Sequence, residues 1–262
     1  MKDGPLFKLR ILLKSIEIFR NWYLYPLVYF NLTSKPFVIF ETKTDLKLKI
    51  RTKSTDLMAL THVWLIEEYR NVDFKIGNND TIVDVGAHIG LFSLFAAQFC
   101  KKGRVFCFEP VNDNYELLLE NIKLNNITNI IPFNCAVSQN SSKVKIFLND
   151  DQSSHSMFIP NSESIEVPSI SVHDIFKENE IKKCDLLKLD CEGAEYDIIK
   201  SIKQEFFGFS EATPNQDNDY PYCVFGLKRS ASDEDMKKAY RKSVLKAHPD
   251  KGGTPELFRN VR

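Results

Sequence analysis

The sequence predicts an α/β fold built on a parallel sheet, followed by a small all-helical segment. Between residues 81 and 210, short apolar runs of strand length alternate with longer segments of helical spacing, the pattern of parallel strands joined by right-handed crossovers. Residues 211–219, EATPNQDND, are polar and rich in turn formers, which predicts a linker. Residues 220–262 then show apolar side chains at helical spacing opposite a basic face.

The composition is that of an ordinary globular protein. Of the 262 residues, 43% are hydrophobic and 27% are charged, and 35 basic side chains balance 35 acidic ones. Such a chain can bury the core of one large or two modest domains, and its zero net charge gives no indication of nucleic acid as the main partner. Six cysteines occur without a CxxC pair, which favours reduced core thiols and a cytoplasmic location.

Residues 1–36 predict an N-terminal aromatic helix. Charged side chains interrupt the apolar residues between Leu6 and Leu32, so no stretch is long enough to span a bilayer. No small-residue cleavage site marks a signal peptide. The aromatic residues around Trp22 and Tyr25 favour a helix that packs on the domain, with peripheral contact to a membrane surface as the alternative.

Residues 37–80 predict an N-terminal cap made of a hairpin and a helix. Residues 37–41 and 46–51 read as the two strands of the hairpin. Residues 56–69 have the spacing of an amphipathic helix, and five apolar side chains are expected toward a core: Leu57, Leu60, Val63, Trp64 and Leu65.

Residues 81–210 predict the main domain. Its strands are expected at 81–85, 104–108, 130–136 and 185–189, its helices at 91–99, 112–125 and 194–207, and an inserted pair of strands at 143–148 and 165–170. The last main strand reads as buried.

The first strand of this domain ends in a glycine-spaced acidic turn, DVGAHIG. Gly86 and Gly90 let the backbone approach a ligand and let the next helix pack closely on its strand. A carboxylate at Asp84 would repel a pyrophosphate, but it suits the ammonium and sulfonium of S-adenosylmethionine. His88 stands where the GxGxxG dinucleotide fingerprint needs glycine, which weakens the dinucleotide alternative.

Further acidic residues follow the next strands. Glu109 closes the second strand about 20 residues after the turn, where a carboxylate can accept hydrogen bonds from ribose hydroxyls. Asp190 ends the 185–189 strand, and Glu192 and Glu195 follow it. Methyl transfer to a hydroxyl needs alignment and a base, for which Asp190 or Glu192 is the candidate, while Glu195 is expected in solvent. No cluster of histidines or cysteines has metal-ligand spacing, so no metal is expected.

From about residue 37 to residue 202 the chain resembles the FkbM family of S-adenosylmethionine-dependent methyltransferases, through TIVDVGAHIGLFS, VFCFEPVNDNYELLLENIKLNN, NCAVS and DLLKLDCEGAEYDII. The resemblance implies a Rossmann-like class I methyltransferase sheet and transfer of a methyl group to a hydroxyl of a sugar or natural-product-like small molecule. It implies cofactor binding by six residues and a methyl acceptor facing two: Asp84, Gly86, Gly90, Glu109, Asn134 and Ala136 for the cofactor, and Asp190 and Glu192 for the acceptor. The polar loop 150–157, with Ser153, Ser154 and His155, is a candidate wall for the acceptor.

The chain departs from the family pattern in two places. His88 replaces the more usual asparagine of the turn, a mild change because histidine can still donate a hydrogen bond. A complete class I domain also continues after the Asp190 strand with further strands and helices, whereas here the linker follows the 194–207 helix closely. We therefore expect a sheet that is incomplete on its C-terminal side, with its last strand at an edge and with lowered stability or activity.

The C-terminal residues 220–262 predict a helical hairpin. Ser232 is a good N-cap with three acidic residues in the first turn behind it, and Pro249 ends the helix. The HPD tripeptide between this KKAYRK helix and a second helix resembles the DnaJ-type J-domain. The resemblance implies contact with a DnaK-type chaperone through five residues: His248, Pro249, Asp250, Lys238 and Arg241. The chain reaches Arg262 early in the second helix, so we expect a partial, marginally stable hairpin.

Three functional hypotheses follow. The first is a methyltransferase that carries a J-like tail and acts on a small-molecule hydroxyl acceptor. The second is a co-chaperone or adaptor that recruits a DnaK-type chaperone and uses the methyltransferase fold only for binding. The third is an inactive fusion of two truncated domains.

Overall fold

The computed structural model describes residues 4–66, 75–148, 163–191 and 198. The helices and strands belong to the compact unit Leu9–Phe209, except that the first helix, α1, begins at Pro5, before the unit starts. Its centre is a four-stranded parallel sheet with the order β5-β4-β3-β9, which confirms the predicted parallel α/β fold. The four strands are β3 (Thr81–Val85), β4 (Arg104–Phe108), β5 (Ile130–Phe133) and β9 (Leu186–Leu189).

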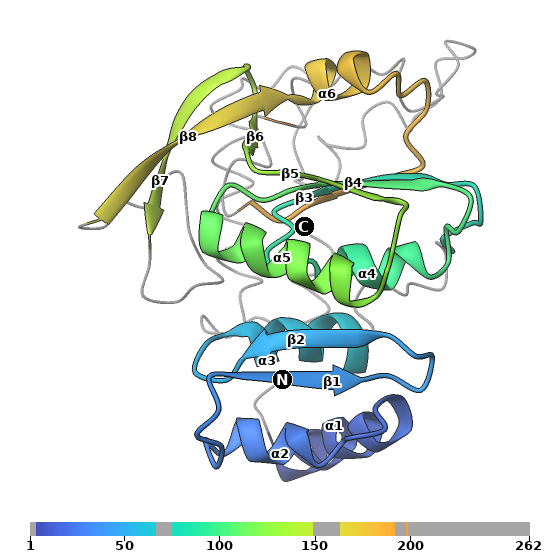
Figure 1. Cartoon of the computed structure of the whole chain (residues 1–262), viewed down its shortest axis with the longest axis vertical. Coiled ribbons are helices and arrows are strands. Elements are labelled where there is room, and N and C mark those ends of the chain that lie inside the picture. The colour runs from blue at the N-terminus through green and yellow to red at the C-terminus, as the bar shows by residue number, and fades with distance from the viewer. Residues whose placement is uncertain (1–3, 67–74, 149–162, 192–197, 199–262) are drawn as a thin grey trace, which may run out of the picture. The chain divides into compact units, whose positions relative to one another are not determined.

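Helices cover both faces of this sheet (Figure 1). On one face lie α4 (Leu91–Ala97) and α5 (Asn112–Leu124), and on the other lies α6 (Val172–Glu178). All seven residues of α4 are buried, as expected for the sequence LFSLFAA, in which Ser93 is the one polar residue. Because side chains alternate along a strand, Val83 and Val85 point into the core with α6, while Asp84 points to the α4 face.

The last strand of the sheet differs from the expectation. All four residues of β9 are half-buried, not buried, and β9 lies at the edge of the sheet among the strands that the structure describes. Its edge position agrees with the prediction, and its partial exposure follows because only β3 flanks it there. The predicted helix 194–207 lies outside the described residues, apart from Ile198.

The expected strand 130–136 is in fact two strands that belong to different sheets. It divides into β5 and β6 (Ala136–Ser138), because the Asn134 side chain turns away to donate a hydrogen bond to the Glu109 carbonyl oxygen at 2.9 Å. β6 joins a second, three-stranded sheet with β7 (Ser142–Leu148) and β8 (Glu163–Ser171), the predicted inserted pair.

The short helix α6 was not predicted. Ser171 caps it by accepting a hydrogen bond from the Asp174 backbone N–H at 3.1 Å, and the Ser171 hydroxyl donates to the Asp174 carboxylate at 2.8 Å. The N-cap serine and the acidic residue three positions later are both visible in the sequence SVHD.

The N-terminal region expected as one helix forms two, α1 (Pro5–Ile18) and α2 (Leu24–Tyr29). Between them the chain bonds to the edge of the hairpin. Phe19 makes an isolated bridge to Thr42, and the Asn21 side chain donates to the Ile39 carbonyl and accepts from the Glu41 N–H, both at 2.9 Å. The helix breaks because these bonds satisfy backbone groups of the hairpin edge.

The predicted hairpin is confirmed as β1 (Phe37–Glu41) and β2 (Lys47–Arg51), paired antiparallel. The helix that follows is shorter than expected: α3 (Asp56–Leu60) passes directly into a π-helical turn η1 (Thr61–Leu65). The Trp64 indole N–H of this turn donates to the Leu91 carbonyl at 3.3 Å. The part of the expected helix after Ile66 lies outside the described residues.

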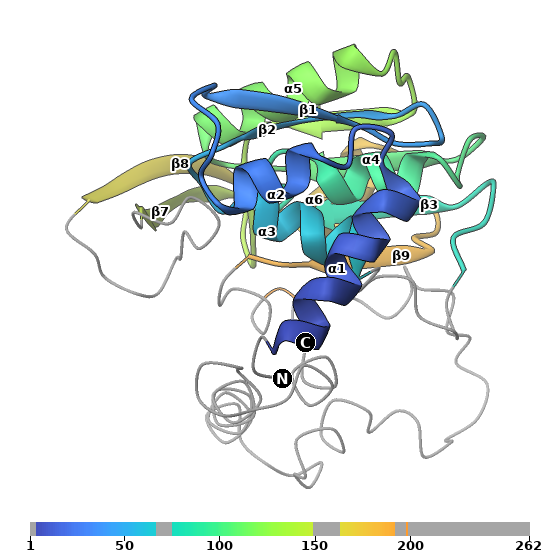
Figure 2. The ribbon, with the colours of Figure 1, turned by 90° about the horizontal axis from the view of Figure 1, so that it is seen from below.

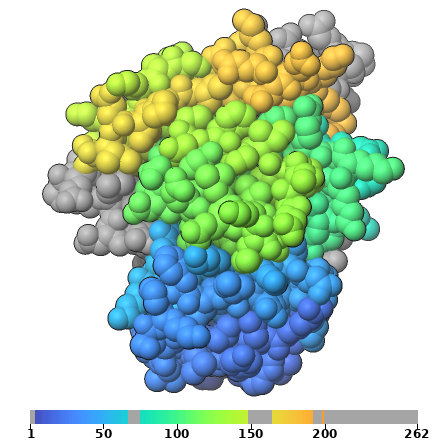
Figure 3. All heavy atoms as spheres, in the orientation of Figure 1, coloured from blue at the N-terminus to red at the C-terminus, as the bar shows by residue number. Residues whose placement is uncertain are grey.

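The hairpin docks on α5 through two asparagine side chains. Asn125 accepts from the N–H of Lys47 and donates to its carbonyl, both at 2.7 Å. One turn earlier, Asn121 accepts from the N–H of Lys49 at 2.7 Å and donates to its carbonyl at 3.0 Å. These amides bond the free edge of β2 as a neighbouring strand would. In Figure 3 the side chains of the hairpin region, in blue, meet those of α5, in green.

Helix α1 buries little of its surface. Only Ile11 and Ser15 are buried, whereas an apolar stripe at helical spacing is exposed: Leu6, Leu9, Leu13 and Ile16. Figure 2 looks onto the side where α1 and α2 lie. No helix in the described part of the chain is long and apolar enough to cross a membrane.

Candidate functional site

Four strand ends meet at one edge of the central sheet. Hydrogen bonds continue beyond the strands: Gly86 N–H to the Phe108 carbonyl at 3.0 Å, Glu109 N–H to the Phe133 carbonyl at 3.1 Å, and Asp190 N–H to the Val85 carbonyl at 3.1 Å. The structure therefore brings the glycine turn, Glu109, Asn134 and Asp190 to the carboxyl edge, where ligands bind in open α/β sheets.

The turn after β3 needs glycine for two reasons. Gly86 has φ +73°, and an added Cβ would lie 2.0 Å from the Asp190 carbonyl oxygen. Gly90 has φ +83° and approaches the Leu118 side chain. Between them His88 adopts φ +52°, a left-handed conformation that is uncommon for a residue with a side chain. The turn is thus strained and closely packed against the end of β9.

Glu109 lies beside this turn and is almost fully buried. One carboxylate oxygen accepts from the His88 N–H at 2.7 Å, and the other accepts from the Val111 N–H at 2.9 Å and from the Asn114 amide at 3.5 Å. Burial raises the pKa of Glu109 to about 7, and these hydrogen bonds oppose the rise. The carboxylate is therefore fixed in orientation but close to its protonation point at neutral pH.

Asp84 lies beneath the turn and is fully buried. One of its oxygens pairs with Lys188 Nζ at 2.9 Å, and the other accepts from the Ser93 hydroxyl at 2.7 Å. Lys188 also donates to the Gly86 carbonyl at 3.2 Å. Asp84 thus joins β9, α4 and the turn, and its charge is balanced within the protein.

The other predicted site residues divide into three groups. Asn134 lies at the edge, bonded to the Glu109 carbonyl, and the Asp190 side chain is one-third exposed with Lys188 Nζ at 3.8 Å. Ala136, in contrast, is buried in β6 of the second sheet. The remaining predicted residues lie outside the described part of the chain: Glu192, Glu195, the 150–157 loop, Lys238, Arg241, His248, Pro249 and Asp250.

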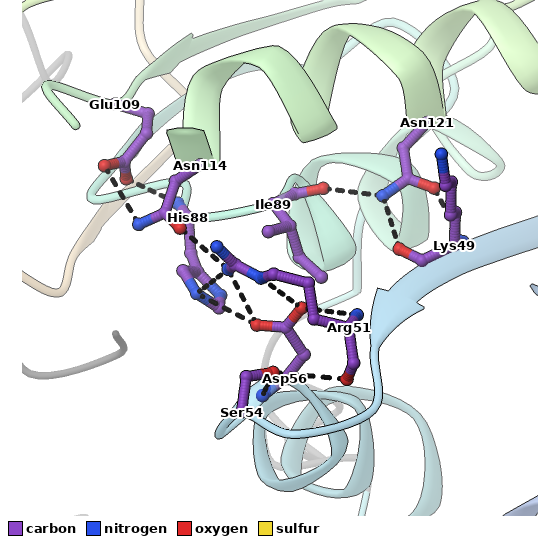
Figure 4. Close-up of polar contacts among 9 residues, drawn as sticks. All are labelled: Lys49, Arg51, Ser54, Asp56, His88, Ile89, Glu109, Asn114 and Asn121. Carbon is purple, nitrogen blue, oxygen red and sulfur yellow. Dashed lines mark hydrogen bonds and ion pairs between the residues drawn. The ribbon is translucent and has the colours of Figure 1, made fainter. Parts of the chain in front are cut away.

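Sequence reasoning missed a polar cluster that joins the cap to the turn (Figure 4). The Arg51 guanidinium makes two hydrogen bonds to the fully buried Asp56, at 2.9 and 2.8 Å, and contacts His88 Nε2 at 3.2 Å and Asn114 Oδ1 at 2.7 Å. The available signal was the row of asparagines on the buried face of an otherwise amphipathic α5, Asn114 and Asn121, since buried amides need partners.

The edge has the chemistry of an adenosyl site. A fixed, buried carboxylate beside a glycine turn offers acceptors to vicinal hydroxyls, and the turn gives close backbone approach. Within the described residues no group of three or more histidine, cysteine, aspartate or glutamate side chains is arranged to hold a metal ion. The buried Glu109 carboxylate and the glycine turn fit an organic cofactor with a ribose.

Comparisons with known proteins agree with both resemblances. Residues 84–218, about half of the chain, match the family model of the Methyltransferase FkbM domain, and residues 220–261 match that of the DnaJ domain. The first match runs through most of the segment predicted as a linker.

Individual relatives cover parts of the chain. Methyltransferase sdnD of Sordaria araneosa is 24% identical over 164 residues, which are 50% of this chain and 63% of that protein. DnaJ homolog subfamily B member 12 of Mus musculus is 62% identical over 49 residues, 18% of this chain and 13% of that protein. A solved methyltransferase FkbM from Methylobacillus flagellatus KT shares 20% identity over 55% of this chain and 38% of its own, with a TM-score of 0.37. The chain therefore spans less than two thirds of these relatives.

Proposed function

Because the chain belongs to the FkbM methyltransferase family, we propose that it binds S-adenosylmethionine at the carboxyl edge of the central sheet and methylates a hydroxyl of a sugar or natural-product-like small molecule. The observation that carries the proposal is Glu109, a buried carboxylate held beside a strained glycine turn. Burial of an ionised carboxylate is costly, and a ribose diol would supply further donors that it can accept.

Each end of the cofactor has proposed partners. Glu109 takes the ribose and Asn134 flanks the adenine, while Ala136, buried in β6, supports this segment from the second sheet. Asp84, Gly86 and Gly90 form the methionine side, Asp84 from beneath through Lys188 and Ser93. Since Asp84 is already paired, its role at this end is to shape the turn and lower the local positive potential of Lys188.

The chemistry divides between cofactor and protein. S-adenosylmethionine supplies an electrophilic methyl group when bound. Asp190, partly exposed at the end of β9, is the described candidate for the base that accepts the hydroxyl proton, with Glu192 as the second. Lys188 Nζ lies 3.8 Å from the Asp190 carboxylate, at the same end of β9.

Titration calorimetry with S-adenosylhomocysteine tests the proposal. We expect one site on the full chain, lost in Glu109→Ala and weakened in Asp84→Ala. Folding of each variant is checked by circular dichroism, and Lys143→Ala, at an exposed position in β7, serves as the control. Absence of binding by the folded wild-type chain would contradict the proposal and favour the inactive fusion.

A second candidate function rests on the DnaJ-domain match at residues 220–261. We propose that this segment recruits a DnaK-type chaperone through His248, Pro249 and Asp250, with Lys238 and Arg241 on the contacting face. The proposal is supported if the full chain stimulates the ATPase of a DnaK-type chaperone and the His248→Gln variant does not. Equal ATPase rates with the wild-type chain and with the variant would exclude it. A cytoplasmic location is proposed with both functions.

A further inference from the structure

The strand β2 is held in a fixed register against α5. Three contacts join the strand to the helix. Two are the asparagine contacts of Asn125 with Lys47 and of Asn121 with Lys49. The third is made by Arg51, whose Nη2 donates to the Asn114 side-chain oxygen at 2.7 Å. Asn121 also donates to the Ile89 carbonyl, in the glycine turn after β3, at 3.0 Å. The hairpin is therefore positioned relative to the turn as well as to the helix (Figure 4).

Asp56 fixes the orientation of the Arg51 guanidinium. The carboxylate of Asp56 is fully buried and accepts from the Arg51 backbone N–H, from Nε and from Nη2, at 2.9, 2.9 and 2.8 Å. Such a bidentate pair fixes the planar guanidinium group of Arg51 in one orientation. Arg51 therefore presents Nη2 to the turn and to α5 in a set direction.

Arg51 in turn contacts two of the three residues that donate hydrogen bonds to Glu109; the third donor is the Val111 backbone N–H. Asn114 directs its side-chain oxygen to Arg51 and so presents its amide nitrogen to one Glu109 oxygen, at 3.5 Å. His88, whose ring nitrogen lies 3.2 Å from Arg51 Nη2, donates its backbone N–H to the other Glu109 oxygen at 2.7 Å. Without Arg51, the Asn114 amide loses the contact that holds its oxygen toward Arg51 and its nitrogen toward Glu109.

From this arrangement we infer that Arg51, held by Asp56, is a positioning residue for ribose recognition: it orients Asn114 and the His88 turn so that the Glu109 carboxylate faces the ribose hydroxyls. The inference rests on the proposed function, in which Glu109 takes the ribose. The N-terminal cap is then part of the cofactor site, although the Methyltransferase FkbM domain match begins only at residue 84.

A purely structural role of Arg51 makes a different prediction. If Arg51 only stabilised the fold, its replacement would change the stability of the chain but would not change the preference of the site for a ligand with ribose hydroxyls. The readout is therefore the ratio of the dissociation constants of S-adenosylhomocysteine and its 2′,3′-dideoxyribose analogue, measured by calorimetry on the full chain, with thermal melting of each variant recorded in parallel.

Four variants separate these roles. Asn114→Leu breaks the link to Glu109 and leaves the Arg51–Asp56 pair intact. Arg51→Met combined with Asp56→Asn removes the pair without leaving a buried charge. Arg51→Lys keeps the charge beside Asp56 but lacks the fork that reaches both His88 and Asn114. Lys47→Met, on the same strand with an exposed side chain, is the matched control.

In the wild-type chain the hydroxyls should improve binding by roughly tenfold or more, the range for hydrogen bonds to a charged group. That preference should fall to about twofold or less in Asn114→Leu and in the double variant, be intermediate in Arg51→Lys, and remain in Lys47→Met. An unchanged preference in the folded variants would overturn the inference alone. Failure of the wild-type chain to bind S-adenosylhomocysteine would instead overturn the proposed function, and binding without any preference would overturn the ribose role of Glu109 and this inference with it.

Discussion

Removal of the Lys188 ammonium should destabilise the methyltransferase domain strongly. Lys188 is 9% exposed and pairs at 2.9 Å with Asp84, which is fully buried. Lys188→Met therefore leaves a buried carboxylate without its cation, a change that costs about 3–5 kcal/mol. For a domain of this size each kcal/mol corresponds to about 2–4 °C, so the melting temperature measured by circular dichroism should fall by about 6–20 °C.

Two further variants show whether charge burial is the cause. Lys188→Met with Asp84→Asn removes both charges, and the amide oxygen of the new asparagine can still accept the Ser93 hydroxyl, so most of the lost melting temperature should return. Lys183→Met breaks the exposed pair with Asp185 on the same segment and should leave the melting temperature unchanged. A single Lys188→Met variant that melts within about 2 °C of the wild-type chain would refute the reasoning.

Three other predictions follow from the site and the surface. Gly86→Ala should prevent stable folding, because its Cβ would lie 2.0 Å from a carbonyl oxygen at φ +73°, and soluble yield and circular dichroism measure this. Because the pKa of Glu109 is raised to about 7, its contribution to stability is present below its unfolded pKa near 4.5 and is lost as pH rises through 7. The ionised form accepts better, so S-adenosylhomocysteine should bind about tenfold more weakly at pH 6 than at pH 8, and Glu109→Gln should show no such change in calorimetry. The exposed apolar stripe on α1 predicts that the chain co-sediments with phosphatidylserine vesicles and that the double variant Leu9→Ser with Leu13→Ser does not. Equal co-sedimentation of the wild-type chain and the double variant would exclude membrane contact through this stripe.

Local sequence patterns were sufficient to predict most of the strands of the fold. Strands β3, β4 and the β1–β2 hairpin were predicted at their observed bounds or within one residue, because alternation and turn residues act over short distances. The single strand expected at 130–136 failed where a tertiary contact overrode local propensity: Asn134 bonds to the Glu109 carbonyl, and the chain changes sheets.

The site was predicted only in part for a related reason. Asp84, Glu109 and Asp190 are recognisable because each lies at or just after the carboxyl end of a predicted strand. The partners of Asp84 and the Arg51–Asp56 pair come from segments distant in sequence, and such contacts leave no periodic signature. The structure places Glu109 and Asp190 at this edge, whereas Asp84 lies buried beneath the turn and its charge, which the sequence suggested was open to a ligand, is balanced by Lys188.

The central claim is that the carboxyl edge of the sheet, with Glu109 at its centre, is an S-adenosylmethionine site. A crystal structure of the full chain with S-adenosylhomocysteine tests it most directly. We expect both ribose hydroxyls within hydrogen-bond distance of the Glu109 carboxylate, with the homocysteine end over the turn from Gly86 to Gly90. Ligand bound elsewhere on the chain, or in a pose that leaves Glu109 without contact to the ribose, would contradict it.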